Sequence, residues 1–137
     1  MSPRDDVLPQ PARLPESLDR AYNAELTRAR HVLKALECAQ DESLREEWRT
    51  RLTDARARAV MLARMLGELG IDPAPAPHPV AGNGDCLLDA MELALRNGDL
   101  TAAEAIAREC VLLADVHCTQ AWRHVQQAMT VGVTLAA

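Results

Sequence analysis

The sequence predicts an all-α protein, built as a four-helix bundle from one domain of 137 residues. Hydrophobic residues make up 48% of the chain, which is enough to bury a core without disulfides or metal. Aromatic residues make up only 2%, with no Phe, whereas β-sheets favour aromatic and β-branched side chains. Four segments also repeat apolar residues at steps of three and four, which is the period of a helix with one buried face.

The first helix is predicted over residues 16–40, after a Pro-rich and disordered arm at residues 1–15. The arm carries prolines and charged residues and lacks a sustained apolar pattern. The helix that follows has one apolar stripe, formed by Leu18, Tyr22, Leu26, Ala29, Leu33 and Leu36.

The second helix is predicted over residues 43–69. Ser43 and Glu46 form a capping box that satisfies the first free amides of the helix, and Gly70 supplies its stop. Its buried stripe follows the same spacing and consists of Leu44, Trp48, Leu52, Ala55, Ala59, Leu62 and Leu66.

A Pro-rich connector separates the second helix from a short third one. Alternating prolines between Gly70 and Asp85 remove amide donors, so this stretch does not form a helix. The third helix is predicted over residues 85–97, where Asn97 and Gly98 supply the stop.

The fourth helix is predicted over residues 100–130, with Thr101 and Glu104 as its capping pair. A small apolar tail at residues 131–137 follows it, and the sequence leaves open whether this tail frays or lies against a neighbouring subunit. The stripe of the helix includes Ile106, Cys110, Leu113, Ala114, Ala121, Val125 and Ala128.

Connector lengths bear on the topology. The short connections near Asp41 and Asp99 force antiparallel neighbours. The connector of about 15 residues reaches roughly 45 Å, which is close to the length of about 40 Å of a 27-residue helix. The third helix could therefore start at the far end and run parallel to the second. Two hairpins joined by one long crossover form the ferritin-like topology.

Two stretches carry a family resemblance that extends over residues 18–129. One is the end of the second helix, ARMLGELGIDP, and the other is LRNGDLTAAEAIARE, which leads into the last helix. The chain resembles the ferritin-like superfamily, specifically its small bacterial stress-associated branch of unknown function. This resemblance implies a helical bundle with a stress-related role.

The metal chemistry of ferritin-like proteins is expected to be absent. Their di-iron centres use Glu-x-x-His pairs on two helices, and this chain contains no such pair. Glu25 nevertheless falls within the apolar stripe of the first helix, where a carboxylate needs a partner. The alternative function is therefore a metal-binding or metal-storage bundle that uses Glu25 and His117. Cys110 and His124, each seven residues from His117, line a possible metal site or a dimer seam.

A histidine phosphotransfer domain is a second alternative. His31 is expected on the polar face of the first helix, and the pattern His31, Val32, Leu33 and Lys34 resembles the start of the phosphotransfer motif. In that chemistry an exposed imidazole accepts a phosphoryl group, and a nearby cation such as Lys34 steadies its charge.

The four cysteines are expected to be reduced thiols, because the protein is expected in the cytosol, and the lack of a CxxC pair argues against a zinc knuckle or a thioredoxin-like motif. Asp115 and Cys118 lie three residues apart, but Asp115 is expected on the polar face of its helix, so the pair is not expected to share an ion. No cofactor is assigned, although a divalent metal is left open.

Charge and composition narrow the class of protein further. A net charge of −5 disfavours nucleic acid, and the chain has neither the apolar core of a secretion signal nor a run long enough to span a membrane. Because no catalytic motif is present either, we expect a cytoplasmic, non-enzymatic protein. The short third helix leaves part of the core open, which favours a homo-oligomer, most simply a dimer, or an unknown protein partner.

Overall fold

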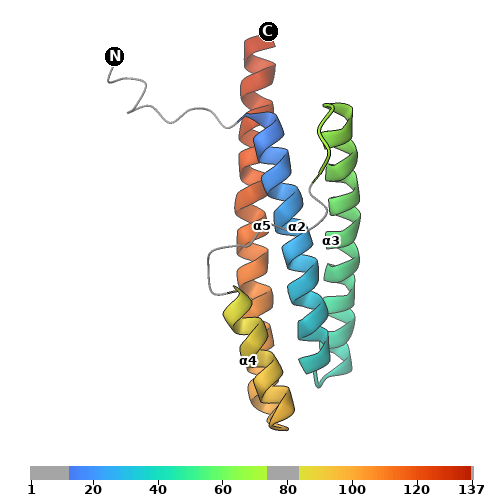
Figure 1. Cartoon of the computed structure of the whole chain (residues 1–137), viewed down its shortest axis with the longest axis vertical. Coiled ribbons are helices and arrows are strands. Elements are labelled where there is room, and N and C mark those ends of the chain that lie inside the picture. Colours follow the sequence, from blue (N-terminus) through green and yellow to red (C-terminus); the bar gives the residue numbers. More distant parts are fainter. Residues whose placement is uncertain (1–12, 74–83, 137) are drawn as a thin grey trace, which may run out of the picture.

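The computed structural model describes residues 13–73 and 84–136, and within this part every regular element is a helix (Figure 1). The elements are α2 (Leu14–Cys38), α3 (Glu42–Glu68), α4 (Gly84–Arg96) and α5 (Leu100–Ala136). The predicted all-α fold with four helices is therefore confirmed. No helix of the described residues is both long and apolar enough to cross a membrane.

The structure confirms the predicted end of α3 but not its predicted cap. Asp41 occupies the N-cap position and forms no side-chain capping bond, and the helix already begins at Glu42. The predicted capping box of Ser43 and Glu46 is therefore wrong, because Ser43 lies inside the first turn. The predicted stop at Gly70 is confirmed, since this residue has a φ of +76°, a conformation in which glycine avoids a Cβ clash.

The hairpin between α4 and α5 turns at Gly98, which has a φ of +70° and confirms the predicted stop. Asp99 caps α5 instead of the predicted Thr101, because the Asp99 side chain accepts a hydrogen bond from the Ala102 amide at 3.1 Å. Glu104 does not act as a capping partner but accepts a bond from the Gln40 amide at 3.4 Å, which ties the start of α5 to the end of α2.

Both ends of the predicted bundle differ slightly from expectation. The first helix begins at Leu14, inside the predicted arm, and Pro15 is placed in its first turn, where the missing amide hydrogen costs nothing. The rest of the arm, residues 1–12, lies outside the described residues. At the other end α5 continues as a helix to Ala136 instead of stopping at residue 130.

The central helix of the bundle is α2, which packs against α3 on one side and α5 on the other (Figure 1). The short α4 lies along the first half of α5 and also touches α2. Among the described residues, α3 makes close backbone contacts with α2 alone. As a result α3 and α5 flank α2, and only their side chains meet.

The direction of α4 differs from the one that the connector length allowed. Arg30 of α2 pairs with Asp85, and Lys34 pairs with Glu92, so α2 and α4 run in the same direction. Because α2 and α3 form an antiparallel hairpin, α4 runs opposite to α3 (Figure 1). The parallel arrangement of the second and third helices, which the predicted ferritin-like topology requires, is therefore not formed. These two ion pairs fix one flank of α4, and its apolar residues pack against the start of α5.

The core consists of two apolar clusters arranged along the bundle. The lower cluster joins the end of α2, the start of α3, α4 and the start of α5, with Trp48 and Met91 among its buried members. The upper cluster joins the start of α2, the end of α3 and the middle of α5, with Leu18, Leu62 and Val125 at its centre. Between the two clusters the helices face one another with charged side chains.

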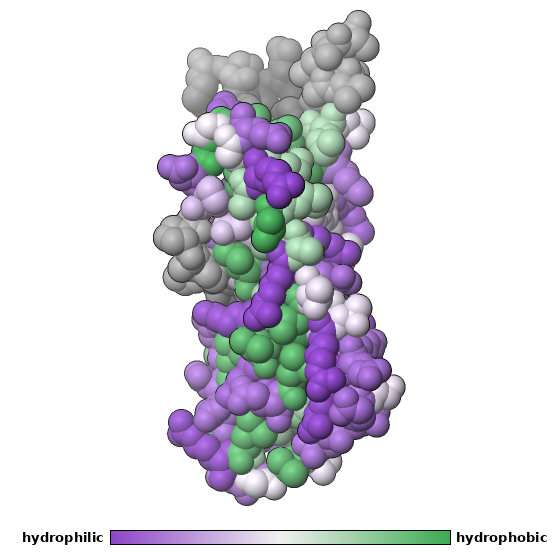
Figure 2. Space-filling view, turned by 90° about the vertical axis from the view of Figure 1, so that its right-hand side faces the viewer, coloured by the Kyte–Doolittle hydropathy of each residue, from purple (hydrophilic) through white to green (hydrophobic). Residues whose placement is uncertain are grey.

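Apolar side chains also reach the surface. On the side of the molecule where α3 lies, they form a lengthwise strip bordered by hydrophilic side chains (Figure 2). Large apolar residues that are exposed in the described part of the chain include Leu33 of α2 and Val60 and Met61 of α3. The bundle therefore does not hide all of its apolar surface.

Candidate functional site

A polar layer lies between the two apolar clusters, and Glu25 of α2 is at its centre. The Glu25 side chain is fully buried, as its place in the apolar stripe predicted. Its Oε2 accepts a hydrogen bond of 2.7 Å from the indole Nε1 of Trp122, and the Cys118 thiol lies 3.7 Å from Oε1. Both partners come from α5, so this carboxylate joins α2 to α5.

Two arginines supply the positive charge that Glu25 needs. Arg28, one helical turn further along α2, places Nη1 3.6 Å from Oε1 of Glu25, and Arg58 of α3 places Nη1 4.0 Å from Oε2. A buried carboxylate without such partners would be costly, because the low dielectric of the interior penalises an isolated charge. The predicted need for a partner is thus met by arginine and indole groups.

Asp115 of α5 holds the other end of the polar layer. Its Oδ1 forms an ion pair with Arg28, whose Nη2 lies 2.8 Å away, and its Oδ2 pairs with Arg51 of α3. The Arg51 pair spans α3 and α5, whose backbones make no close contact with each other. Ionic side chains therefore bridge the gap that the packing on α2 leaves open.

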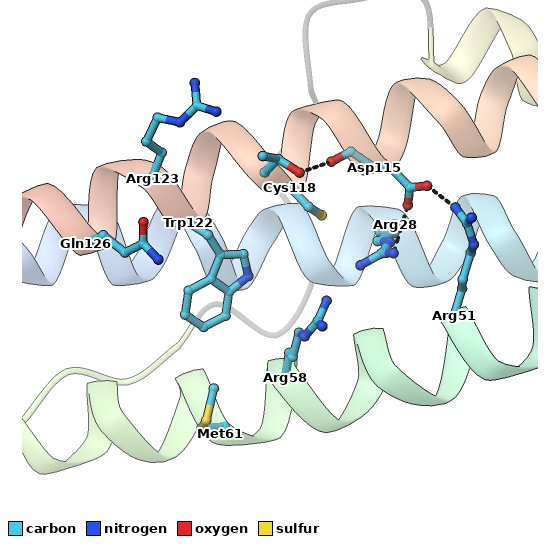
Figure 3. Close-up of a pocket in the computed structure, with 10 residues that line it drawn as sticks. Arg28, Arg51, Arg58, Met61, Asp115, Cys118, Trp122, Arg123 and Gln126 are labelled. Carbon is cyan, nitrogen blue, oxygen red and sulfur yellow. Dashed lines mark hydrogen bonds and ion pairs between the residues drawn. The ribbon is translucent and has the colours of Figure 1, made fainter.

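A groove with a volume of about 660 Å³ runs over this layer between α3 and α5 (Figure 3). The Arg51 and Asp115 pair closes one end, and the Trp122 ring reaches down from α5 toward Met61 of α3 at the other. Arg58 rises from α3 into the space between them. The groove thus combines an aromatic and thioether wall with a cationic group.

The Cys118 thiol lies buried on the floor of this groove. Burial raises the pKa of Cys118 to about 12, and the nearby charge of Glu25 contributes further. A thiol of such a pKa stays protonated near neutral pH and is a poor nucleophile. Cys118 therefore acts as a small donor toward Glu25 and the Ala24 carbonyl, which it approaches at 3.3 Å.

His117 does not join Glu25 in a site. It is exposed, and among the described side chains no hydrogen bond or ion pair links it to Glu25. The neighbouring Cys118 takes that position, because one residue along α5 turns the side chain by about 100°. Within the described ranges, no three His, Cys, Asp or Glu side chains gather closely enough to hold a metal ion.

The two other candidates on α5 lie in different surroundings. Cys110 is buried in the lower apolar cluster, where burial and the neighbouring Cys38 raise its pKa to about 11. His124 is partly buried on the upper half of α5. Neither residue belongs to the polar layer around Glu25.

His31 is not on an exposed polar face as predicted. Its side chain is only 6% exposed, and Nε2 has no hydrogen-bond partner within the described part of the structure. Burial lowers its pKa, and so does the charge of Arg30, whereas Asp85 of α4 raises it and His117 of α5 lowers it. Asp85 of α4 and His117 of α5 thus lie near enough to the imidazole to influence its charge. The predicted exposure that phosphotransfer requires is therefore wrong.

Lys34, the cation expected beside His31, has partners of its own. Its ammonium group pairs with Glu92 of α4 and lies 3.3 Å from Glu37. The hydrogen bond that Lys34 donates to Glu92 raises the pKa of the Lys34 ammonium group, partly offset by desolvation. Lys34 thus helps to dock α4 on α2.

Sequence reasoning missed Trp122 and Arg58, and it placed Asp115 on a polar face. A usable signal was the spacing of Asp115, Cys118 and Trp122, which are three and four residues apart and so share one side of α5. This pattern marks one side of the helix but does not reveal that the same side faces Glu25.

A second feature is the exposed apolar face of α5. Leu112, Leu113 and Val116 are 62%, 43% and 48% exposed. Leu113 lies seven residues after Ile106, so both are on the same face of the helix, and Ile106 packs on the cluster that includes α4. Leu113 thus lies on the α4 side of α5 and is exposed, whereas Leu112 and Val116 lie further round the helix.

No family model, curated protein or solved structure matches this chain. The resemblance to the ferritin-like superfamily therefore stays a prediction. The polar layer and the exposed face of α5 are the two features of the described residues that bear on function.

Proposed function

We propose that this protein is a non-enzymatic, cytoplasmic helical bundle that works by self-association, as a homodimer. The observation that carries the proposal is the exposed face of α5 formed by Leu112, Leu113 and Val116. Three large aliphatic side chains within five positions of one helix form a contiguous apolar patch, and such patches mark association sites. The stress-related role and the ferritin-like ancestry that the sequence suggested belong to this proposal.

The lengths of α4 and α5 support a second copy as the occupant. With 13 residues, α4 extends for about 20 Å, whereas the 37 residues of α5 extend for about 55 Å. Leu113 lies on the α4 side of α5 but beyond the length of α4, so a helix from another chain can pack there and extend over the adjacent Leu112 and Val116. A twofold axis near Val116 would pair the patch with itself, because a dimer with this symmetry buries the same surface on both subunits.

The test is the mass of the protein in solution, measured by light scattering over a range of micromolar concentrations. We expect a dimer for the natural chain and a monomer for the double variant Leu112→Lys and Val116→Lys, because two buried ammonium groups oppose association. The matched control is Val60→Lys on α3, whose side chain is 60% exposed and lies on a different helix.

Two outcomes would contradict the proposal. A natural chain that is monomeric at all these concentrations would remove its basis. A dimer that survives both lysines while circular dichroism shows intact helices would place the interface elsewhere.

A further inference from the structure

The groove between α3 and α5 holds a cationic group that the protein does not fully use. Arg58 is 47% exposed, and its only ion pair within the described residues is the contact of 4.0 Å with Glu25. Glu25 already accepts a hydrogen bond of 2.7 Å from Trp122 and forms an ion pair with Arg28. The Arg58 guanidinium is thus free to form a second, bidentate bond on its open side.

The charges around the groove leave room for one negative charge. Arg28, Arg51 and Arg58 carry three positive charges, and Glu25 and Asp115 carry two negative ones. Glu47, which also pairs with Arg51, is not among the residues that line the groove, so the surplus positive charge lies near Arg58. A fourth arginine, Arg123, also lines the groove, but its side chain points away from α3 (Figure 3). A ligand with a single negative charge would balance the excess near Arg58, whereas a dianion would meet Glu25 and Asp115 as like charges.

The rest of the groove suits an apolar body. The Trp122 ring and the Met61 side chain face each other across it, and Met61 is partly exposed. Aromatic rings and thioethers adapt well to aliphatic and aromatic surfaces. The volume of about 660 Å³ also falls in the usual range for pockets that hold small organic molecules.

We propose that this groove binds an organic monocarboxylate, whose carboxylate pairs with Arg58 and whose apolar body lies between Trp122 and Met61. The hydrogen bond from Trp122 to Glu25 holds the indole in place for this contact. The groove shares no lining residue with the exposed apolar patch of α5, and the inference does not rest on self-association.

The test uses sodium decanoate as the probe, below the concentration at which it forms micelles, and follows tryptophan fluorescence. The chain has two tryptophans, and Trp48 is buried in the lower cluster, so the variant Trp48→Phe isolates the signal of Trp122. We expect a saturable change in emission and a matching heat of binding for the natural chain in calorimetry. The calorimetric measurement stands if Trp48→Phe folds poorly.

Variants and related probes separate ionic recognition from simple partitioning. Arg58→Gln should weaken decanoate binding by about tenfold or more, as expected when a hydrogen bond to a charged group is lost. The control Arg56→Gln, an exposed arginine of α3 that does not line the groove, should leave binding unchanged. The neutral 1-decanol and the dianionic decyl phosphate should both bind more weakly than decanoate.

Several results would overturn the inference. They are the absence of saturable binding, decanoate binding that Arg58→Gln leaves unchanged in a folded protein, and 1-decanol binding as tight as that of decanoate. A preference for decyl phosphate would equally contradict it, because the charge balance around Glu25 and Asp115 favours one negative charge.

Discussion

Replacing Glu25 with Gln tests whether the polar layer stabilises the bundle through charge. Gln has nearly the same shape and can still accept a hydrogen bond from the Trp122 indole, but this hydrogen bond then joins two neutral groups. Hydrogen bonds to charged groups contribute about 1.5–3 kcal/mol, whereas neutral ones contribute about 0.5–1.5 kcal/mol, so this bond alone loses about 1 kcal/mol. The amide NH₂ of Gln would also face the guanidinium donors that lie 3.6 Å and 4.0 Å from the carboxylate.

The second loss comes from Arg28, which is nearly buried and would keep only Asp115 as an anionic partner. Removing one partner of a buried ion pair lowers stability by about 3–5 kcal/mol. Because Arg28 keeps its ion pair with Asp115, we expect this loss to be only about 1 kcal/mol. We therefore expect Glu25→Gln to lower the free energy of unfolding by about 2 kcal/mol. For a chain of this size the midpoint of thermal unfolding should fall by roughly 8 °C.

Thermal and urea unfolding followed by circular dichroism would measure this change. Glu68→Gln, at an exposed position near the end of α3, is the matched control and should stay within about 0.5 kcal/mol of the natural chain. A double-mutant cycle of Glu25→Gln with Trp122→Phe should give a coupling of about 1 kcal/mol. If Glu25→Gln is as stable as the control, the charge of Glu25 does not stabilise the fold and the reasoning fails.

Three further predictions concern titration, thiol reactivity and turn geometry. Because the pKa of His31 is lowered in the folded state, its contribution to stability is fully present above the unfolded value near 6.5 and is lost as the pH falls below it. In the variant His31→Gln, the free energy of unfolding should therefore depend less on pH in this range. Of the four thiols, exposed Cys86 should react first with a thiol reagent at mildly alkaline pH, whereas Cys110 and Cys118 should react only on unfolding, and rapid labelling of all four would contradict their burial. Gly98→Ala should cost about 1 kcal/mol in urea unfolding, because its φ of +70° is strained for any residue with a Cβ, although the space around it is open; an unchanged midpoint would show that the turn relaxes freely.

The polar layer also bears on how the helices choose their alignment. Glu25 and Asp115 interrupt the apolar stripes of α2 and α5 at one level, and Arg28 pairs with both. A shift of one helix by a turn would move a buried charge into an apolar cluster, which is costly. We infer that this layer selects the register of α5 on α2, a known role of buried polar groups in helical assemblies.

Periodicity in the sequence determined the four helices and their apolar faces. The predicted bounds agree with the structure within a few residues, except at the end of α5, and the turns at Gly70 and Gly98 were identified from the glycines themselves. The burial of Glu25 also followed from its place in a stripe. These features are local, because they depend on the spacing of residues along one helix and on the conformations that one residue can adopt.

Only the tertiary structure decided what surrounds each side chain. His31 lies on the flank of α2 that looks polar in sequence, yet it is buried because α2 is the central helix and has neighbours on several sides. Likewise the partners of Glu25 come from positions 33 and 97 residues away, and Cys118 instead of His117 faces it. A helical pattern specifies which face is apolar, but the order and rotation of the neighbouring helices determine which residues meet, and these depend on packing over the whole bundle.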